Sequence, residues 1–350
     1  MNMNAIDIFC GAGGLSSGLA AEGVRIVAGV DFDPACRWPF TANHNADFIE
    51  ADVSKLTASE LQTAWPKNGV RLLAGCAPCQ PFSTWSNGRD AMQDAKWGLL
   101  SHFGRLMAET LPELVTMENV PGLARHQVFQ DFISLLKYTG YHIWYGVVFC
   151  PDYGIPQQRR RLVLLASRLG PIELIPPTHT PKLYRTVRQA IGRLPPVAAG
   201  EAHPSDPLHR AAAMNPTNMA RIRASRPGGT WNDWPESLRA ACHRRKSGEK
   251  SAAVYGRMTW DDPAPTMTTL CYGFGNGRFG HPEQDRALTL REAALLQTFP
   301  KNYRFIEPGK ELNMRAIGRM IGNAVPPALG RVVARSFKIH LEAVDKLQRA

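Results

Sequence analysis

The sequence predicts an α/β fold, in which a largely parallel β-sheet carries helices on both faces. Over the first 170 residues, short apolar runs alternate with helix-length amphipathic segments. This alternation is typical of strands joined by right-handed helical crossovers, which produce parallel sheets. A glycine-rich segment, residues 11–18, follows the first apolar run. Glycines at that point let the backbone turn tightly between a strand and a helix.

Six apolar runs have the length of buried strands. In chain order they span residues 5–10, 25–30, 70–74, 114–117, 142–149 and 162–166. Amphipathic helical spacing lies between them, at residues 99–110 and 128–138.

The pattern changes near residue 171. Six prolines between residues 171 and 196 interrupt any long element, and the segment that follows is rich in Arg, Trp and His. Helical spacing returns over residues 315–349, after the pair Pro326-Pro327. We therefore predict a first domain formed by residues 1–176 and 305–350, and a second, smaller and irregular domain formed by residues 177–304.

Composition excludes a disordered chain, a collagen-like repeat and a coiled coil. Hydrophobic residues make up 44% and charged residues 20%, as in ordinary globular chains. No apolar run approaches the ~20 residues that span a bilayer, and the first residues do not resemble a secretory signal. The seven cysteines are an odd, scattered set. We expect a cytoplasmic protein with reduced thiols and no membrane partner.

Charge is divided unevenly along the chain. Residues 1–150 carry 10 Lys and Arg against 14 Asp and Glu, a net −4, whereas residues 151–350 carry 31 against 16, a net +15. A basic half of this strength suggests that it binds a polyanion. A basic surface that is merely solvated is the alternative, and composition favours neither.

The glycine-rich segment is a candidate ligand site. Its spacing, Gly11-x-Gly13-Gly14-x3-Gly18, differs from the G-x-G-x-x-G of dinucleotide sites. Asp31 ends the second apolar run and could accept hydrogen bonds from ribose, and Asp52 could accept from the amine of adenine. Either carboxylate could instead cap a helix or be solvated. Taken in order along one sheet edge, they favour an adenosine-containing cofactor.

The segment Gly75-Cys-Ala-Pro-Cys79 follows another apolar run and allows three interpretations. Its Cys-x-x-Cys spacing could bind zinc, but Cys242-His243 and Cys271 are poor partners, and we assign no metal ligands. It could be a redox motif, but the chain is far longer than a thioredoxin domain. The third interpretation is a nucleophilic Cys79 at a strand's carboxyl end, where α/β folds place their sites.

Two further segments favour the nucleophile. Glu118 directly follows the run at 114–117, and Arg159 and Arg161 precede the last run, at the same predicted sheet edge. Neither a zinc site nor a redox site uses a carboxylate and arginines in this way.

These segments resemble, in order and over nearly the whole chain, the motifs of the DNA (cytosine-5) methyltransferases. The matching segments are residues 9–14, 78–80, 118–120, 157–161, 286–297 and 322–327. Six motifs in one order are highly specific. Two positions depart from the family pattern: Lys96-Trp97-Gly98-Leu99 replaces Arg-Gly-x-Leu, and Leu295 stands where the family often has Arg.

The resemblance implies a Rossmann-like sheet of an S-adenosylmethionine-dependent methyltransferase with a smaller, irregular target-recognition domain, whose variable region would be residues 177–280. It implies that Cys79 adds to C6 of a cytosine flipped out of duplex DNA, and that C5 receives the methyl group, leaving S-adenosylhomocysteine. Glu118 would donate a proton to N3, Arg161 would bind O2, and Arg159 would hold a phosphate or the loop of residues 80–96, which would close over the flipped base.

The resemblance also implies binding residues. Those for S-adenosylmethionine are Phe9, Gly11, Gly13, Gly14, Asp31, Phe32, Asp52, Val53, Pro78, Leu99, Asn323 and Val325, although the two aromatic residues could equally be core. Those for double-stranded DNA are Gln80, Ser83, Ser86, Arg89, Gln157, Arg244, Arg245, Arg257 and Thr268. Most of the basic ones would contact phosphate, and any single one could be merely solvated.

Three alternatives compete with a DNA methylase. They are an RNA methylase of the same family acting on tRNA, a relative without catalysis that only binds, and a thioredoxin-like or Rossmann oxidoreductase. We expect a monomer, with a cognate restriction enzyme or defence-system proteins as candidate partners.

Overall fold

The computed structural model describes residues 2–78, 98–245 and 254–349. The chain divides into two compact units. Unit 1 comprises Met1–Tyr153, Arg160–Thr178 and Ala324–Ala350, and unit 2 comprises Gly154–Arg159 and His179–Asn323. Among the described residues, no helix has both the length and the apolar character needed to cross a bilayer.

Within its described residues, unit 1 is built on a seven-stranded sheet of order β3-β2-β1-β4-β5-β7-β6. The strands are β1 (Met3–Ile8), β2 (Arg25–Asp31), β3 (Asp47–Glu50), β4 (Val70–Gly75), β5 (Leu114–Asn119), β6 (His142–Phe149) and β7 (Arg160–Ser167). Neighbouring strands pair in parallel from β3 to β5, and β7 pairs antiparallel with both β5 and β6. The predicted, largely parallel sheet is therefore confirmed.

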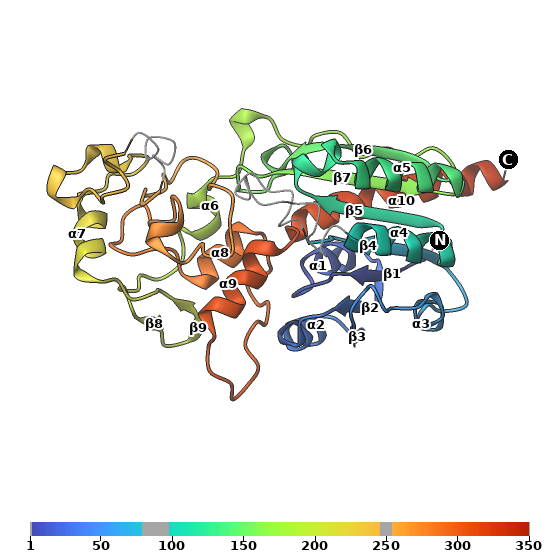
Figure 1. Cartoon of the computed structure of the whole chain (residues 1–350), viewed down its shortest axis with the longest axis horizontal. Helices are drawn as coiled ribbons and strands as arrows, with labels where there is room; N and C mark the ends of the chain where they lie inside the picture. The colour runs from blue at the N-terminus through green and yellow to red at the C-terminus, as the bar shows by residue number, and fades with distance from the viewer. Residues whose placement is uncertain (1, 79–97, 246–253, 350) are drawn as a thin grey trace. The chain divides into compact units, whose positions relative to one another are not determined.

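Helices cover both faces of this sheet (Figure 1). They are α1 (Gly14–Ala21), α2 (Arg37–Asn43), α3 (Ala58–Ala64), α4 (Gly98–Thr110), α5 (Gln127–Tyr138) and α10 (Pro327–Arg349). In α4 and α5 the buried apolar residues recur every three to four positions, as an amphipathic helix requires. Their side chains join those of the central strands in one hydrophobic core. Helix α10 packs against α1.

The strand order creates a switch point between β1 and β4. From β1 the chain continues to β2 and β3 on one side, and from β4 it continues to β5 on the other. Open α/β sheets bind ligands in the crevice beyond the carboxyl ends of the strands at such a point. The segments after β1, β2, β4 and β5 all begin at this edge.

Unit 2 is irregular. Its helices α6 (Val187–Ile191), α7 (Pro216–Ala224), α8 (Leu290–Leu296) and α9 (Met314–Asn323) and its strands β8 (Ala202–His203) and β9 (Asp206–Arg210) are joined by long loops and short 3-10 turns. A small apolar cluster contains Ile222, Trp231, Trp234, Phe274 and Ala287. Frequent prolines and few apolar residues in regular spacing explain why long elements do not form.

The units divide the chain at points that differ from the predicted ranges. Residues 305–323 belong to unit 2, because α9 packs on α8 and Ile321 O accepts a 2.7 Å hydrogen bond from Gln297 Nε2. Residues 154–159 also belong to unit 2, because Gln158 N donates to Ala264 O and Ala264 N donates to Pro156 O.

Candidate active site

The turn after β1 is the first part of the site. Phe9, Gly11 and Gly13 all have positive φ, at 62°, 54° and 84°. Gly13 closes the turn by donating to Cys10 O at 2.8 Å and then begins α1 as its N-terminal cap. In the part of the chain that the structure describes, no atom lies within 4 Å of the position that a Cβ on Gly11 would occupy. The backbone here leaves open space beside a helix N-terminus.

Asp31 connects this turn to the end of β2. Its Oδ2 accepts from Gly11 N at 2.8 Å, and its Oδ1 accepts from Asp33 N at 2.9 Å. Burial raises the pKa of this carboxyl group. The neighbouring Phe32 is 75% exposed, so the alternative that it is a core residue is wrong.

The remaining predicted cofactor residues differ in exposure. Asp52 is half-buried and its Oδ1 accepts from Ser54 N at 2.9 Å, whereas Val53 is buried in the core. In unit 1, Pro78 and Leu99 are half-buried and Val325 is buried, and in unit 2 Asn323 is exposed.

The first turn of α10 packs closely against α1. A Cβ on Gly18 would lie 2.1 Å from Pro327 O and 2.7 Å from Gly330 Cα. This close approach places the start of α10 beside the helix that begins at the glycine turn. An exposed aromatic ring, a strand-end carboxylate and an open glycine turn fit the adenosine and methionine parts of S-adenosylmethionine.

Glu118 and Arg161 meet at the ends of β5 and β7. Arg161 Nε lies 2.9 Å from Glu118 Oε1, and the glutamate is only 5% exposed. This N–H does not point at the oxygen, and among the described residues no group donates a hydrogen bond to Oε1. A buried carboxylate oxygen beside a guanidinium, with unused acceptor capacity, suits a polar substrate.

Two residues tie β4 to β5 at the same edge. The Cys76 thiol donates to Glu118 Oε2 at 3.0 Å, and Asn119 Nδ2 donates to Ala77 O at 3.0 Å. Sequence reasoning gave Cys76 no role beyond the rejected zinc and redox motifs. One sequence signal could have identified it: Cys76 comes just after an apolar run, as Glu118 does, and so is expected at the same edge of the sheet. Cys79 itself lies outside the described residues.

The segment 157–161 is divided between the two units: residues 157–159 belong to unit 2, and residues 160 and 161 belong to unit 1. Gln157, predicted to contact DNA, is fully buried: its Nε2 donates to Gln297 Oε1 at 2.6 Å, and its Oε1 accepts from Met267 N at 2.8 Å. This prediction was wrong, because both ends of the amide are occupied inside unit 2. Arg159 is also buried and donates to Met267 O at 3.1 Å, whereas the loop of residues 80–96 that it was predicted to hold lies outside the described residues.

Among the predicted DNA-binding residues of unit 2, Arg257 requires a correction. It is 4% exposed and donates to the carbonyls of Ile222, His281 and Gln284, while its Nη2 pairs with Asp285. A guanidinium with so many internal partners stabilises unit 2 and is not available to phosphate.

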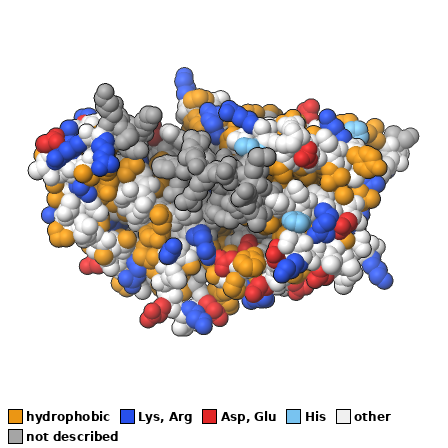
Figure 2. All heavy atoms as spheres, in the orientation of Figure 1, with side chains coloured by type: hydrophobic (Ala, Val, Ile, Leu, Met, Phe, Trp, Pro, Cys, Tyr) orange, Lys and Arg blue, Asp and Glu red, His pale blue; other side chains and the backbone are white. Residues whose placement is uncertain are grey.

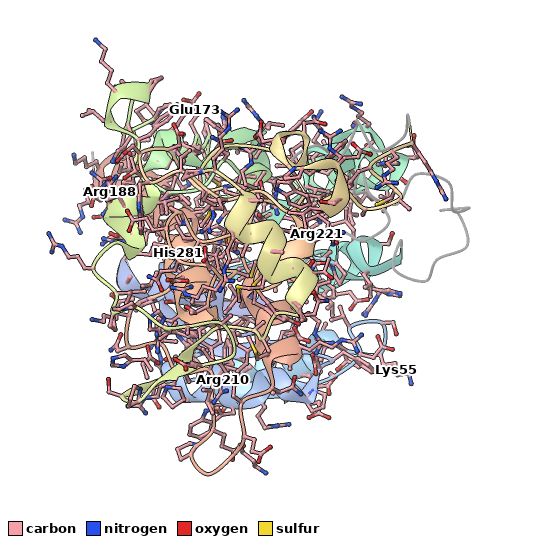
Figure 3. The ribbon with its side chains drawn as sticks, turned by 90° about the vertical axis from the view of Figure 1, so that its left-hand side faces the viewer. Lys55, Glu173, Arg188, Arg210, Arg221 and His281 are labelled. Carbon is pink, nitrogen blue, oxygen red and sulfur yellow. The ribbon has the colours of Figure 1, made fainter. Side chains whose placement is uncertain are left out.

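Other basic residues of unit 2 do reach the surface. Arg244, Arg245 and Thr268 are exposed, and Arg244 Nε pairs with Glu236 at 3.2 Å. On the face seen in Figure 2, Lys and Arg side chains alternate with apolar and acidic ones. Figure 3 labels Arg221 on α7 and Arg188 near the periphery. Gln80, Ser83, Ser86 and Arg89 lie outside the described residues.

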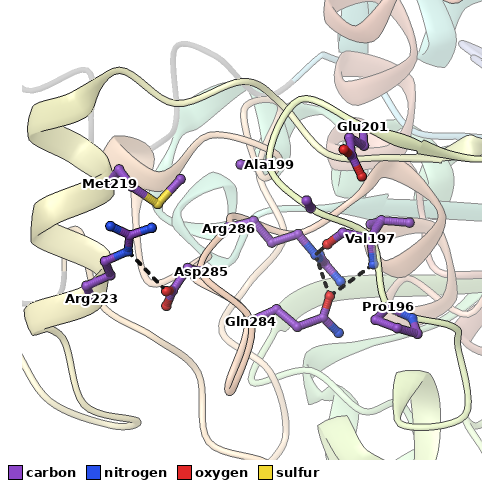
Figure 4. Close-up of a pocket in the computed structure, with 10 residues that line it drawn as sticks. Pro196, Val197, Ala199, Glu201, Met219, Arg223, Gln284, Asp285 and Arg286 are labelled. Carbon is purple, nitrogen blue, oxygen red and sulfur yellow. Dashed lines mark hydrogen bonds and ion pairs between the residues drawn. The ribbon is translucent and has the colours of Figure 1, made fainter.

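Unit 2 also contains a pocket of about 470 Å³ (Figure 4). Its polar lining is occupied internally: Arg286 Nε donates to Val197 O and Gln284 Oε1, and Arg223 pairs with Asp285. Of the predicted catalytic and cofactor residues that the structure describes, none lines it. Among the described residues, no three His, Cys, Asp or Glu side chains gather as a metal site would require.

Glu292, from the segment 286–297, forms a fully buried ion pair. Arg286 Nη1 and Nη2 each lie 2.7 Å from one of its carboxylate oxygens, and this pairing holds the pKa of Glu292 below its usual range against burial, which raises it.

Comparison with known proteins identifies the family of the chain. The profile of the C-5 cytosine-specific DNA methylases matches residues 3–338. The Type II methylase M.HgiDII of Herpetosiphon aurantiacus is 51% identical over 347 residues, covering 98% of this chain and 97% of its own. The Type II methyltransferase M1.HphI of Haemophilus parahaemolyticus is 32% identical, covering 96% and 87%.

A solved structure shares the fold. It is a prophage-encoded candidate DNA modification methyltransferase of Escherichia coli, which superimposes with a TM-score of 0.75 at 21% identity and covers 97% of this chain and 100% of its own. The predicted architecture is confirmed. With a matching profile over nearly its whole length and a relative at 51% identity, the chain belongs to the C-5 cytosine-specific DNA methylase family and is a DNA (cytosine-5)-methyltransferase.

Proposed function

We propose that this enzyme methylates C5 of a cytosine within a specific duplex sequence, using S-adenosylmethionine and a covalent adduct between Cys79 and C6. The observation that carries the proposal is the buried Glu118, held between Cys76 and Arg161 at the strand edge from which the Cys79 segment starts. A carboxyl group and a guanidinium there can engage N3 and O2 of a pyrimidine.

The cofactor would be held at the ends of β1 and β2. Asp31 would accept from the ribose hydroxyls, Phe32 would stack on adenine, and the turn at Gly11 and Gly13 would leave room for the methionine part. When bound, S-adenosylmethionine supplies an electrophilic methyl group. The close packing of Gly18 against Pro327 supports this site, because it fixes the helix that begins at the turn.

Cytosine C5 is a weak nucleophile until a thiolate adds to C6. We assign that addition to Cys79, whose thiolate must be favoured locally because a free thiol has a pKa of about 8.5. Glu118 would give its proton to N3 as the ring gains electrons, and Arg161 would hold O2. The unused acceptor capacity of Glu118 Oε1 supports this assignment.

Unit 2 would select the target. Exposed Arg244, Arg245 and Thr268 are its proposed DNA contacts. Further proposed contacts are Gln80, Ser83, Ser86 and Arg89, which follow Cys79 in the chain. Flipping the cytosine out of the stack costs a few kcal/mol, which phosphate contacts must offset. We infer a monomer working on DNA in the cytoplasm. Because its relatives are named as Type II enzymes, we infer a cognate restriction enzyme as a partner.

The direct test is transfer of radioactive methyl groups to duplex DNA and, in parallel, to tRNA. We expect labelled DNA and unlabelled tRNA, and bisulfite sequencing of DNA from expressing cells should show 5-methylcytosine at one recurring sequence. Methylation of tRNA alone, or of adenine, would refute the proposal.

A further inference from the structure

The proposed chemistry uses Cys79 but leaves Cys76 without a role. Cys76 directly follows β4, and its backbone N donates to Ile8 O at 3.3 Å. Gly75 pairs with Met117 in the parallel register of β4 and β5, so Cys76 and Glu118 are the next residues on the two strands. The register itself brings the thiol and the carboxylate together.

Reciprocal hydrogen bonds fix this arrangement. The Cys76 thiol donates to Glu118 Oε2 at 3.0 Å, and the side chain of Asn119 donates back to Ala77 O. On its other side, Glu118 Oε1 lies 2.9 Å from Arg161 Nε. The carboxyl plane is therefore held from both sides, with Oε2 assigned to Cys76 and Oε1 facing Arg161.

We propose that Cys76 is a positioning residue for methyl transfer, which directs the acid proton of Glu118 to the oxygen that faces the base. This inference rests on the proposed function. In the protonated acid, the hydrogen bond from Cys76 occupies Oε2, so the proton lies on Oε1. The same bond keeps Oε1 turned toward Arg161 and the ring.

Cys76 also favours the state formed by proton transfer. As the Cys79 sulfur bonds to C6, the ring electrons shift onto N3, which takes the proton from Oε1 and leaves Glu118 as a carboxylate. Cys76 keeps its own proton, and its hydrogen bond now meets a charged acceptor. Hydrogen bonds to charged groups are stronger than those to neutral groups. A contact that strengthens during the reaction affects kcat more than KM.

Cys76→Ala removes the donor, and Cys76→Ser keeps a donor at nearly the same place. We expect kcat of the alanine variant to fall about tenfold, with KM for S-adenosylmethionine and for DNA within about twofold. The serine variant should recover most of kcat. Cys150→Ala, which removes a buried thiol elsewhere in unit 1, is the control and should retain kcat. Thermal unfolding verifies that each variant is folded, and Cys76→Val replaces the alanine variant if that one is not.

A double-mutant cycle separates positioning from a general structural role. In a Glu118→Gln background, Cys76→Ala should cause no further loss of kcat, because the carboxylate it serves is gone. A full tenfold loss in that background would overturn the proposal, as would wild-type kcat in folded Cys76→Ala or equal losses in the serine and alanine variants. Absence of C5 methylation by the wild-type enzyme would overturn this inference and the proposed function together.

Discussion

Among single residues, Glu118 is the proposed proton donor to cytosine, and its surroundings support that proposal. It is buried, one oxygen accepts from Cys76, and the other lies beside Arg161 with unused acceptor capacity. A neutral amide at this position can donate a hydrogen bond but cannot transfer a proton.

Glu118→Gln should therefore lower kcat by ~10²–10⁴-fold, as expected for the loss of a general acid. Affinity for S-adenosylmethionine, measured by calorimetry, should stay within a few-fold, because the proposed cofactor residues are untouched. Glu109→Gln, on exposed α4 surface, is the control. Near-normal turnover of the Glu118 variant would reduce this residue to a structural role.

His281 in unit 2 should make stability depend on pH (Figure 3). Its Nδ1 accepts from Glu283 N and Gln284 N, and burial lowers its pKa from 6.5 to about 4. The unfolded chain binds the proton more readily, so this stabilisation is complete above pH 6.5 and is lost as pH falls toward 4. His281→Asn, with an acceptor oxygen in place of Nδ1, should flatten this part of the profile in urea unfolding followed by tryptophan fluorescence. Exposed His142→Asn should leave it unchanged, and equal profiles for all three proteins would exclude His281 as the cause.

Among the elements, helices α1 and α10 pack closely at Gly18, and this contact supports the proposed cofactor site because α1 begins at the glycine turn. A Cβ on Gly18 would meet three backbone atoms of α10 within 2.8 Å, and backbone atoms cannot move aside as a flexible side chain can.

Gly18→Ala should therefore destabilise the protein by about 1–3 kcal/mol, the usual cost of overpacking. Affinity for S-adenosylmethionine should fall with it, because displacing α1 moves the glycine turn at its start. Ala20→Ser, on the exposed side of the same helix, is the control. Unchanged urea midpoint and cofactor affinity in the glycine variant would show that the two helices can separate freely.

Much of the sheet could be predicted from the sequence, because buried parallel strands are nearly continuous apolar runs. Strand β3 was missed because only Phe48 and Ile49 are apolar in it. Arg257 and Gln157 were misassigned for a different reason: residue type and motif indicate that a polar group matters, but not which way it faces. Their burial depends on partners such as Asp285 and Gln297, which are distant in sequence.

At the scale of the whole molecule, charge is the main guide to DNA binding. Residues 151–350 carry a net +15 and residues 1–150 a net −4. Phosphate contacts should therefore come mainly from the second part, and DNA affinity should fall with salt at a slope near −0.9 per phosphate neutralised.

Exchanging residues 177–280 with those of a relative of different specificity should transfer the recognised sequence and keep the chemistry. Bisulfite sequencing of DNA methylated by the chimera reads the target directly. An active chimera that still methylates the original sequence would place recognition outside this segment. The control for the predicted salt dependence of DNA affinity is the affinity for S-adenosylmethionine measured over the same salt range, because that cofactor carries no phosphate.

We propose that the reaction passes through a covalent bond between Cys79 and C6 of the target cytosine. A duplex carrying 5-fluorocytosine at the target tests it, because fluorine at C5 blocks the proton loss that would release the enzyme after addition and methyl transfer. With S-adenosylmethionine present, we predict a denaturation-resistant complex in which peptide mapping by mass spectrometry finds the nucleotide on Cys79. Cys79→Ser should form no such complex while still binding S-adenosylmethionine. Attachment at Cys76, or no covalent complex with DNA that the enzyme otherwise methylates, would contradict the account.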